Sequence, residues 1–301
     1  MEAIIDNRLV GQVAKELTAT GLAAVSQYEI ARLVFPRAKP DESPKVTYSK
    51  LTSGLLAVGL LTPLTPKKES FLLFGRENAT PAELVCSLDP FCYMSHLSAM
   101  EHHGLTDRFP KILFMTTPSL GQWRDQAKQR MQRDLGELLE RYVDAGLPKL
   151  TRPHISKMKG TTVEFHERSQ LGAFRNVGES PLRVATIGRT FLDMLREPKL
   201  CGGIQHVIDI YREHAKRYLR LIVDEVERHG SSIDKVRAGY ILADVCKLGD
   251  PTIFKWASCA QRGGSRKLDP DAEYAPTYSE TWMLSINVPF LTQPPEDSDD
   301  D

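Results

Sequence analysis

The sequence of 301 residues lacks most of the features that assign a protein to a class at once. None of its five cysteines stands in a Cys-x-x-Cys pair, which argues against a zinc ribbon or a disulfide framework. It has no run of about 18 apolar residues and no signal-like start, so we expect a cytoplasmic protein without a membrane span. Its 39 Lys/Arg and 39 Asp/Glu balance, so the net charge identifies no partner.

The balanced charge is nevertheless unevenly distributed. The stretch 149–175 is rich in cations, with two glutamates against Lys149, Arg152, Lys157, Lys159, Arg168 and Arg175. The last eight residues, PPEDSDDD, carry five acidic side chains and no basic one. We interpret this end as a solvated, disordered tail, and the alternative is a tail that mimics nucleic acid and occupies the basic surface.

Residues 1–76 show the pattern of a small helical unit with a hairpin. Apolar residues recur every fourth position in 6–19, and capping signals begin further helices in 26–36 and 43–59. Two apolar runs joined through 66–68 predict a β-hairpin. Three helices followed by a hairpin is the order of a winged helix-turn-helix.

The rest of the chain mixes strand and helix patterns. Short apolar runs predict strands at 111–117, 161–167 and 182–187, and helical patterns cover 121–145, 188–197, 203–216, 218–229 and 233–247. We therefore expect a helix-rich α+β protein with three parts: a winged helix-turn-helix DNA-binding domain at 1–76, a larger α/β C-terminal domain at 77–260, and a partly disordered acidic tail at 261–301.

The third helix of the first part is the candidate DNA-binding element. A helical wheel places Thr47, Leu51, Leu55 and Val58 on a face that should pack against the other helices. The opposite face offers hydroxyls for base edges and lysines for phosphates. The candidate DNA-binding residues are Lys45, Thr47, Tyr48, Ser49, Lys50, Thr52 and Ser53, with Lys67 and Lys68 of the hairpin. The alternatives are an ordinary polar surface or a winged helix used for protein contacts.

The segment YMSHLSAMEHHGLTDRFP at 93–110 resembles a catalytic cluster. His96 and His103 lie two helical turns apart, about 10 Å, which is too far for two ligands of one zinc ion. Ser98 has no Gly-x-Ser-x-Gly motif around it. We therefore predict a core-facing helix with hydrogen-bonded histidines that ends at Gly104, and no metal or cofactor.

Two further clusters carry charge or glycine. Arg189 and Asp193 are four residues apart, the spacing of a structural ion pair on a helix. Gly202 and Gly203 precede a helix, where a tight turn or an anion-binding nest can form, but the Walker lysine and the Gly-x-Gly-x-x-Gly pattern are lacking. We interpret the two glycines as a turn.

Three segments together resemble the AbiE antitoxin family of abortive-infection toxin–antitoxin pairs. They are YMSHLSAMEHHGLTDRFPKILFMTTP, VATIGRTFLDMLREPKLCGGIQHV and KVRAGYILADVCKLGDP. The matched antitoxin-domain motif residues are Ser98, His103, Gly104, Arg189, Thr190, Asp193, Gly202, Gly203 and Arg237. Gly188 stands where the family usually has an acidic residue. The resemblance covers roughly residues 1–250.

The resemblance implies a transcriptional autorepressor that is not an enzyme. Members bind inverted repeats in their own promoter, on double-stranded DNA, and counter a nucleotidyltransferase-like toxin, in many cases without a stable complex. We therefore expect a cytoplasmic monomer or weak dimer that assembles on DNA. Two alternatives stay open: a nucleic-acid-processing enzyme that uses His96, His102, His103 and Asp193, and an interaction module whose segment 149–175 binds an acidic partner.

Overall fold

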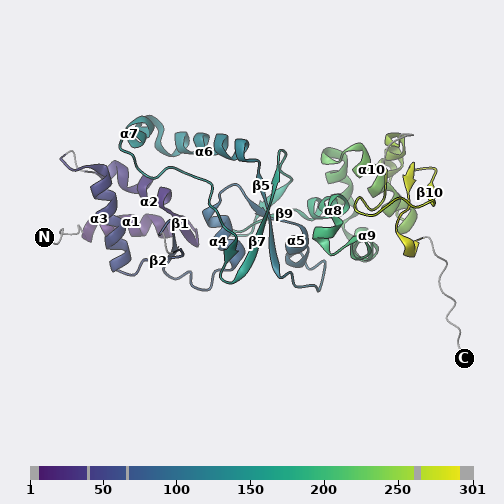
Figure 1. Cartoon of the computed structure of the whole chain (residues 1–301), viewed down its shortest axis with the longest axis horizontal. Coiled ribbons are helices and arrows are strands. Elements are labelled where there is room, and N and C mark those ends of the chain that lie inside the picture. Colours follow the sequence, from purple (N-terminus) through teal and green to yellow (C-terminus); the bar gives the residue numbers. More distant parts are fainter. Residues whose placement is uncertain (1–6, 39–40, 66–67, 261–265, 292–301) are drawn as a thin grey trace, which may run out of the picture. The chain divides into compact units, whose positions relative to one another are not determined.

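The chain divides into two compact units, each of which is described by itself. The computed structural model describes residues 7–38, 41–65, 68–260 and 266–291. The first unit comprises Met1–Met94, Lys111–Leu171 and Arg175–Val184, and the second comprises Ser95–Pro110, Gly172–Phe174 and Ala185–Asp301. Helices and sheets occur together, which is the expected α+β class (Figure 1). The division does not follow the boundaries at 76 and 260 that the sequence suggested.

The chain begins with three helices and a small sheet. The elements are α1 (Asn7–Ala19), β1 (Ala24–Ser26), α2 (Gln27–Val34), α3 (Pro44–Ala57), β2 (Leu61–Pro63) and β3 (Ser70–Leu73). The three strands are antiparallel in the order β1-β3-β2. The predicted hairpin is therefore present as β2 and β3.

Apolar spacing explains how these helices pack. Val13 and Leu17 of α1 are fully buried with Leu55 of α3 in one core. Residues four apart, such as Val13 and Leu17, lie on one face of a helix. This apolar face of α1 can therefore pack against the apolar face of α3. Val58 was expected on the packing face, but it is 63% exposed because α3 ends at Ala57 and Val58 is its C-cap.

A second sheet of six strands completes the first unit, in the order β6-β7-β5-β4-β9-β8. Its strands are β4 (Tyr93–Met94), β5 (Ile112–Pro118), β6 (Lys157–Met158), β7 (Thr161–Arg168), β8 (Phe174–Asn176) and β9 (Arg183–Ala185). β5 and β7 are parallel, so the chain between them must cross back over the sheet. α6 (Leu120–Leu135) and α7 (Leu139–Asp144) form this crossover. The first unit also contains α4 (Pro81–Leu88), which begins at a complete Thr80–Glu83 capping box.

The second unit is mainly helical. Its elements are α5 (His96–His102), α8 (Ile187–Arg196), α9 (Ile204–His229), α10 (Ser232–Gly239), a π-helix (Tyr240–Val245), α11 (Pro251–Trp256), β10 (Tyr278–Ser279) and β11 (Leu284–Ser285). Two helices predicted at 203–216 and 218–229 are one continuous helix. The described residues of both units also form short 3-10 helices at Phe35–Arg37, Gly136–Leu138, Pro198–Cys201, Ala257–Cys259 and Pro289–Leu291.

Residues 266–291, which lie in the segment predicted to be partly disordered, form part of the second unit. Trp282 and Leu284 are buried in the core of the second unit, and β10 pairs with β11. Trp282 also donates a hydrogen bond from Nε1 to Asp244, at 2.8 Å. Burial of these side chains outweighs the polar, proline-rich composition of the segment. Residues 261–265 and the acidic end from 292 lie outside the described residues.

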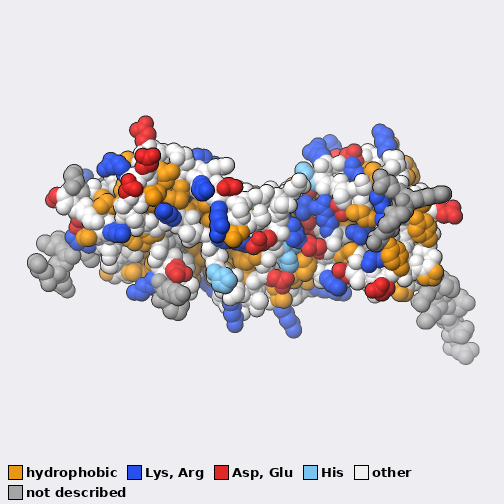
Figure 2. All heavy atoms as spheres, turned by 45° about the horizontal axis from the view of Figure 1, so that its top comes forward, with side chains coloured by type: hydrophobic (Ala, Val, Ile, Leu, Met, Phe, Trp, Pro, Cys, Tyr) orange, Lys and Arg blue, Asp and Glu red, His pale blue; other side chains and the backbone are white. Residues whose placement is uncertain are grey.

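The face of the molecule shown in Figure 2 carries side chains of both charges. On the face shown in Figure 2, Lys and Arg side chains are interspersed with Asp and Glu. Among the described residues, no helix is both long enough and apolar enough to cross a membrane. The candidate functional site is therefore described from the positions of individual side chains.

Candidate functional site

The outer face of α3 presents a regular polar row. Lys45, Ser49 and Ser53 are all exposed, and they follow one another at intervals of four residues. Side chains with this spacing lie on one face of a helix, so the three form a strip along α3. One cation and two hydroxyls along such a strip can contact phosphates and base edges.

Thr47 and Lys50, two other predicted DNA-binding residues, are engaged with Glu42. Thr47 is 5% exposed and donates a hydrogen bond to a carboxylate oxygen of Glu42 at 2.9 Å. Thr47 is therefore a packing residue of α3, which corrects its assignment to the DNA-binding set. Lys50 forms an ion pair with the same carboxylate, which offsets its charge.

Tyr48 and Thr52 lie on the flank of α3 and are partly buried. Tyr48 packs against the core of the three helices and against the core that includes α6 and α7. Burial is the main cause that raises the pKa of the Tyr48 hydroxyl. Both side chains therefore take part in packing and are only partly accessible to DNA.

The β2–β3 hairpin, which we call the wing, is held to the start of α2. Gln27 donates from its backbone N to Glu69 O at 3.3 Å and from Nε2 to Lys68 O at 3.0 Å. Lys68 is exposed with φ 54° at the turn, where its N donates to Thr65 O at 3.0 Å. Lys67 lies outside the described residues.

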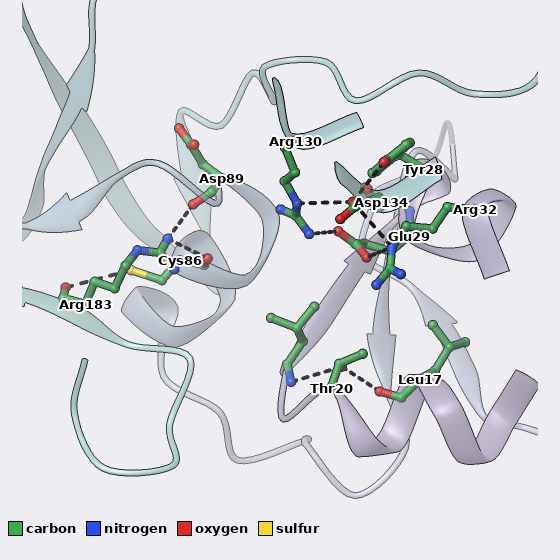
Figure 3. Close-up of polar contacts among 12 residues, drawn as sticks. Leu17, Thr20, Tyr28, Glu29, Arg32, Cys86, Asp89, Arg130, Asp134 and Arg183 are labelled. Carbon is green, nitrogen blue, oxygen red and sulfur yellow. Dashed lines mark hydrogen bonds and ion pairs between the residues drawn. The ribbon is translucent and has the colours of Figure 1, made fainter. Parts of the chain in front are cut away.

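A buried ion-pair network joins α2 to α6, and the sequence did not indicate it. Glu29 of α2 accepts hydrogen bonds from Arg32, at 2.6 Å, and from Arg130 of α6. Tyr28 donates to Asp134 of α6 at 2.9 Å, and burial is the main cause that raises its pKa (Figure 3). Ser26 caps α2 as predicted, but the Glu29 side chain points into this network instead of completing a capping box.

A second polar centre joins α4 to the larger sheet. Arg183 of β9 donates to the carbonyl oxygens of Cys92, Cys86 and Asp89, at 2.7, 2.8 and 2.5 Å (Figure 3). Arginine satisfies carbonyl groups that the end of a helix leaves without partners. The buried Asp89 carboxylate accepts from Trp123 Nε1 at 2.9 Å. These contacts build the first unit rather than a ligand site.

The histidines of segment 93–110 have structural partners. His96 is 1% exposed, and its ring nitrogens hydrogen-bond with Ser95 at 2.8 Å and Glu197 at 3.0 Å. His103 donates from Nε2 to Ala185 O at 2.7 Å. Ser95 is fully buried, so this Ser-His-Glu chain offers no nucleophile that a substrate could reach.

Arg189 and Asp193 form the ion pair that their spacing predicts. Arg189 Nε lies 2.8 Å from Asp193 Oδ1, and both side chains are almost fully buried. A Cβ at Gly172 would lie 2.2 Å from Arg189 Nε, so this glycine leaves the space that the arginine occupies. Thr190 donates to Thr186 O at 2.9 Å within the same helix.

Two glycines near the motifs allow close packing in the second unit. A Cβ at Gly188 would lie 2.4 Å from Leu221 O of α9, so a side chain has no room at this position. A Cβ at Gly239 would lie 2.1 Å from Trp282 Cζ3. Close contact between backbone and neighbour is the common reason for glycine at such positions.

The other motif residues also serve the fold. Ser98 is buried in α5, and Gly104 ends that helix with φ 63°. Gly202 and Gly203 form the turn before α9 with φ 92° and 93°, and Arg108 donates to Gly202 O at 3.0 Å. Arg237 donates from Nε to Lys267 O at 2.9 Å. Within the part of the chain that the structure describes, no group of three His, Cys, Asp or Glu could hold a metal ion.

Comparisons with known proteins assign no family to this chain. No family model matches the sequence, and no curated protein matches it. A solved structure, that of RV2827C protein from Mycobacterium tuberculosis, aligns with 95% of this chain and 94% of its own. The aligned residues are 14% identical and the TM-score is 0.49, a level of similarity that transfers no function.

Proposed function

We propose that the protein is a transcriptional autorepressor and antitoxin of a toxin–antitoxin pair. In this proposal α1, α2, α3 and the wing form a winged helix-turn-helix that binds double-stranded DNA. The element order α1-β1-α2-α3-β2-β3 with sheet order β1-β3-β2 supports it. In such a unit the third helix enters the major groove and the hairpin lies beside it.

The observation that carries the proposal is the exposed strip on α3. Lys45, Ser49 and Ser53 face solvent at intervals of four residues, while Thr47 and Leu51 face the core. Lys68 adds a second exposed cation at the wing. This combination of a phosphate-binding lysine and small hydroxyl side chains suits a helix in a major groove.

The test is a gel shift or fluorescence anisotropy with DNA from the protein's own promoter. We expect binding at low salt that falls steeply as salt increases, because cations displace condensed counterions. The variant Lys45→Glu with Ser49→Glu should weaken binding at least about tenfold. The same change on α1, Lys15→Glu with Thr18→Glu, is the matched control and should bind like the wild type. A wild type that fails to shift the DNA would refute the proposal.

The antitoxin part of the proposal rests on the motif resemblance. Inverted repeats imply two copies of the chain on one promoter, with half-sites one or two helical turns apart. The cognate toxin would be nucleotidyltransferase-like, and direct contact with it is not required. Co-expression with the product of the adjacent gene should relieve growth arrest; arrest that persists at full antitoxin expression would contradict this part alone.

A further inference from the structure

A cleft of about 610 Å³ lies in the first unit beside the wing. One wall is the wing, through Leu64, Thr65, Glu69 and Ser70. The segment 148–159, which follows α7 and includes β6, also lines the cleft. The start of α2, which holds the wing through Gln27, contributes further lining residues. We call this feature the wing cleft.

The charged side chains among the described residues that line the wing cleft are predominantly cationic. Four Lys and Arg side chains stand against one carboxylate, that of Glu69; they are Lys149, Arg152, Lys157 and Lys159. This is the basic stretch that the sequence shows without indicating its place in the fold. An excess of one sign of charge along a cleft raises the local concentration of ligands of the opposite sign.

Two of these cations have partners among the described residues, and the other two are exposed without an ion pair. Arg152 is paired with Glu167 at 2.8 Å, and Lys159 donates to the carbonyl oxygen of Ala79 at 2.9 Å. Lys149 and Lys157 are exposed, and neither forms an ion pair within the described part of the chain. Their charges are therefore available to an external anion.

We propose that the wing cleft binds the sugar–phosphate backbone of double-stranded DNA beyond the contact made by the wing. This inference rests on the proposed DNA-binding function and adds a second contact surface to it. Residues of the wing line the cleft, so a duplex that touches the wing lies close to it. Lys149 and Lys157 lie at the surface, where long flexible side chains can neutralise successive phosphates of a polyanion.

The experiment compares two double variants of equal charge. Lys149→Gln with Lys157→Gln removes the free cations of the cleft, and Lys111→Gln with Lys128→Gln removes two exposed cations of the same unit outside it. Affinity for the promoter duplex is measured by anisotropy between about 50 and 200 mM salt. Circular dichroism confirms that both variants fold.

We expect the cleft variant to lower the magnitude of the slope of log affinity against log salt by about 1.8, or 0.9 for each lost phosphate contact. The control variant should keep the wild-type slope. In a hydroxyl-radical footprint, the cleft variant should lose protection at the flank and keep it at the centre.

The outcomes separate this inference from the proposed function. A wild-type protein that does not bind the duplex refutes the DNA-binding function, and this inference falls with it. A wild type that binds, together with a cleft variant of unchanged slope and footprint, overturns the cleft assignment alone. Equal slope changes in the cleft and control variants also overturn it, because they show only a general charge effect. Single-stranded RNA serves as a second probe. If the cleft variant keeps its affinity for the duplex but loses an affinity for this RNA that the wild type has, the cleft binds RNA and the proposal is overturned.

Discussion

Glu29 in the first unit and Glu225 in the second are both buried carboxylates, and their surroundings differ sharply. Glu29 is 4% exposed and pairs with two guanidinium groups, those of Arg32 and Arg130. Glu225 is 8% exposed, and within the described residues its Oε1 has no hydrogen-bond partner. The charge of Glu29 is compensated by its two arginine partners, whereas the charge of Glu225 is only partly compensated.

The pKa shifts around the two carboxylates show the same difference. Burial opposes the charge of Arg32, but Glu29 outweighs it, and the pKa of the guanidinium is raised. Burial also raises the pKa of Glu225, and the nearby charges of His229 and Arg189 only partly oppose this rise. A buried charge stabilises a fold only where hydrogen bonds and counter-charges replace water.

The comparison has a functional consequence under the proposed function. The Glu29 network attaches α2, half of the proposed helix-turn-helix, to α6, and so fixes its position within the first unit. The Glu225 region includes Arg189 and Asp193, which the proposed function assigns to an antitoxin-domain motif. Asp193 Oδ2 also has no hydrogen-bond partner in the described chain. We therefore expect fewer polar contacts to stabilise the Glu225 region than stabilise the Glu29 network.

The largest expected effect is that of Arg189→Ala. Removal of the guanidinium leaves Asp193 buried beside Glu225 with no counter-charge, which should cost about 3–5 kcal/mol of unfolding free energy. Urea denaturation followed by circular dichroism measures the loss. Arg189→Lys keeps the charge and should cost clearly less. A loss of less than about 1 kcal/mol in Arg189→Ala would show that water compensates Asp193.

Glu29→Gln should have the next largest effect. The amide keeps the shape but removes the charge shared by Arg32 and Arg130, and we expect a loss of about 1–3 kcal/mol in the same denaturation assay. Both guanidinium groups remain partly exposed and close to Asp134, which limits the loss. DNA affinity should fall as well, because α2 is then held to α6 by fewer contacts, those with Asp134.

The matched control for this variant is Glu16→Gln. Glu16 pairs with Arg37 in the same unit, but the Glu16 side chain is 42% exposed, against 5% for that of Glu29. Exposed pairs contribute about 0–1 kcal/mol, so the control should change the stability little. Equal losses in Glu16→Gln and Glu29→Gln would remove the distinction between a buried and an exposed network.

Elements defined by local patterns could be predicted from the sequence. The strands at 111–117 and 161–167, the Thr80–Glu83 capping box and the end of α5 at Gly104 all follow from neighbouring residues. The partners of Glu29 could not be predicted, because Arg130 lies 101 residues away in the sequence. An S-x-x-E pattern is compatible with a capping box, and only the position of α6 shows which partner the carboxylate takes.

The candidate site was predictable to a similar extent. The helical wheel of α3 separates Ser49 and Ser53 from Leu51 and Leu55 correctly. It cannot show that Glu42 engages Thr47 and Lys50, since these contacts depend on the turn before the helix. The basic residues 149–159 were visible as composition, but their position beside the wing depends on the crossover through α6 and α7.

The smallest expected effect is that of Glu225→Gln, and its sign differs from the others. The folded pKa of Glu225 is raised, so the folded state binds more protons than the unfolded state above pH 4.5. Wild-type stability should therefore fall as pH rises from 4.5 through the raised pKa. The Glu225→Gln variant lacks this decrease, so its free energy of unfolding at pH 7 should exceed that of the wild type by on the order of 1 kcal/mol.

Glu227, two residues further along α9, provides the opposite case. Hydrogen bonds from Lys235 and Trp256 lower its pKa, so its contribution is present at neutral pH and is lost as pH falls through the lowered pKa. Glu227→Gln should therefore be less stable than the wild type at pH 7 and nearly equal at low pH, whereas Glu225→Gln should be more stable at pH 7. Melting temperatures of both variants at several pH values test this contrast. A destabilised Glu225→Gln at pH 7 would mean that Arg189 and His229 compensate the carboxylate after all.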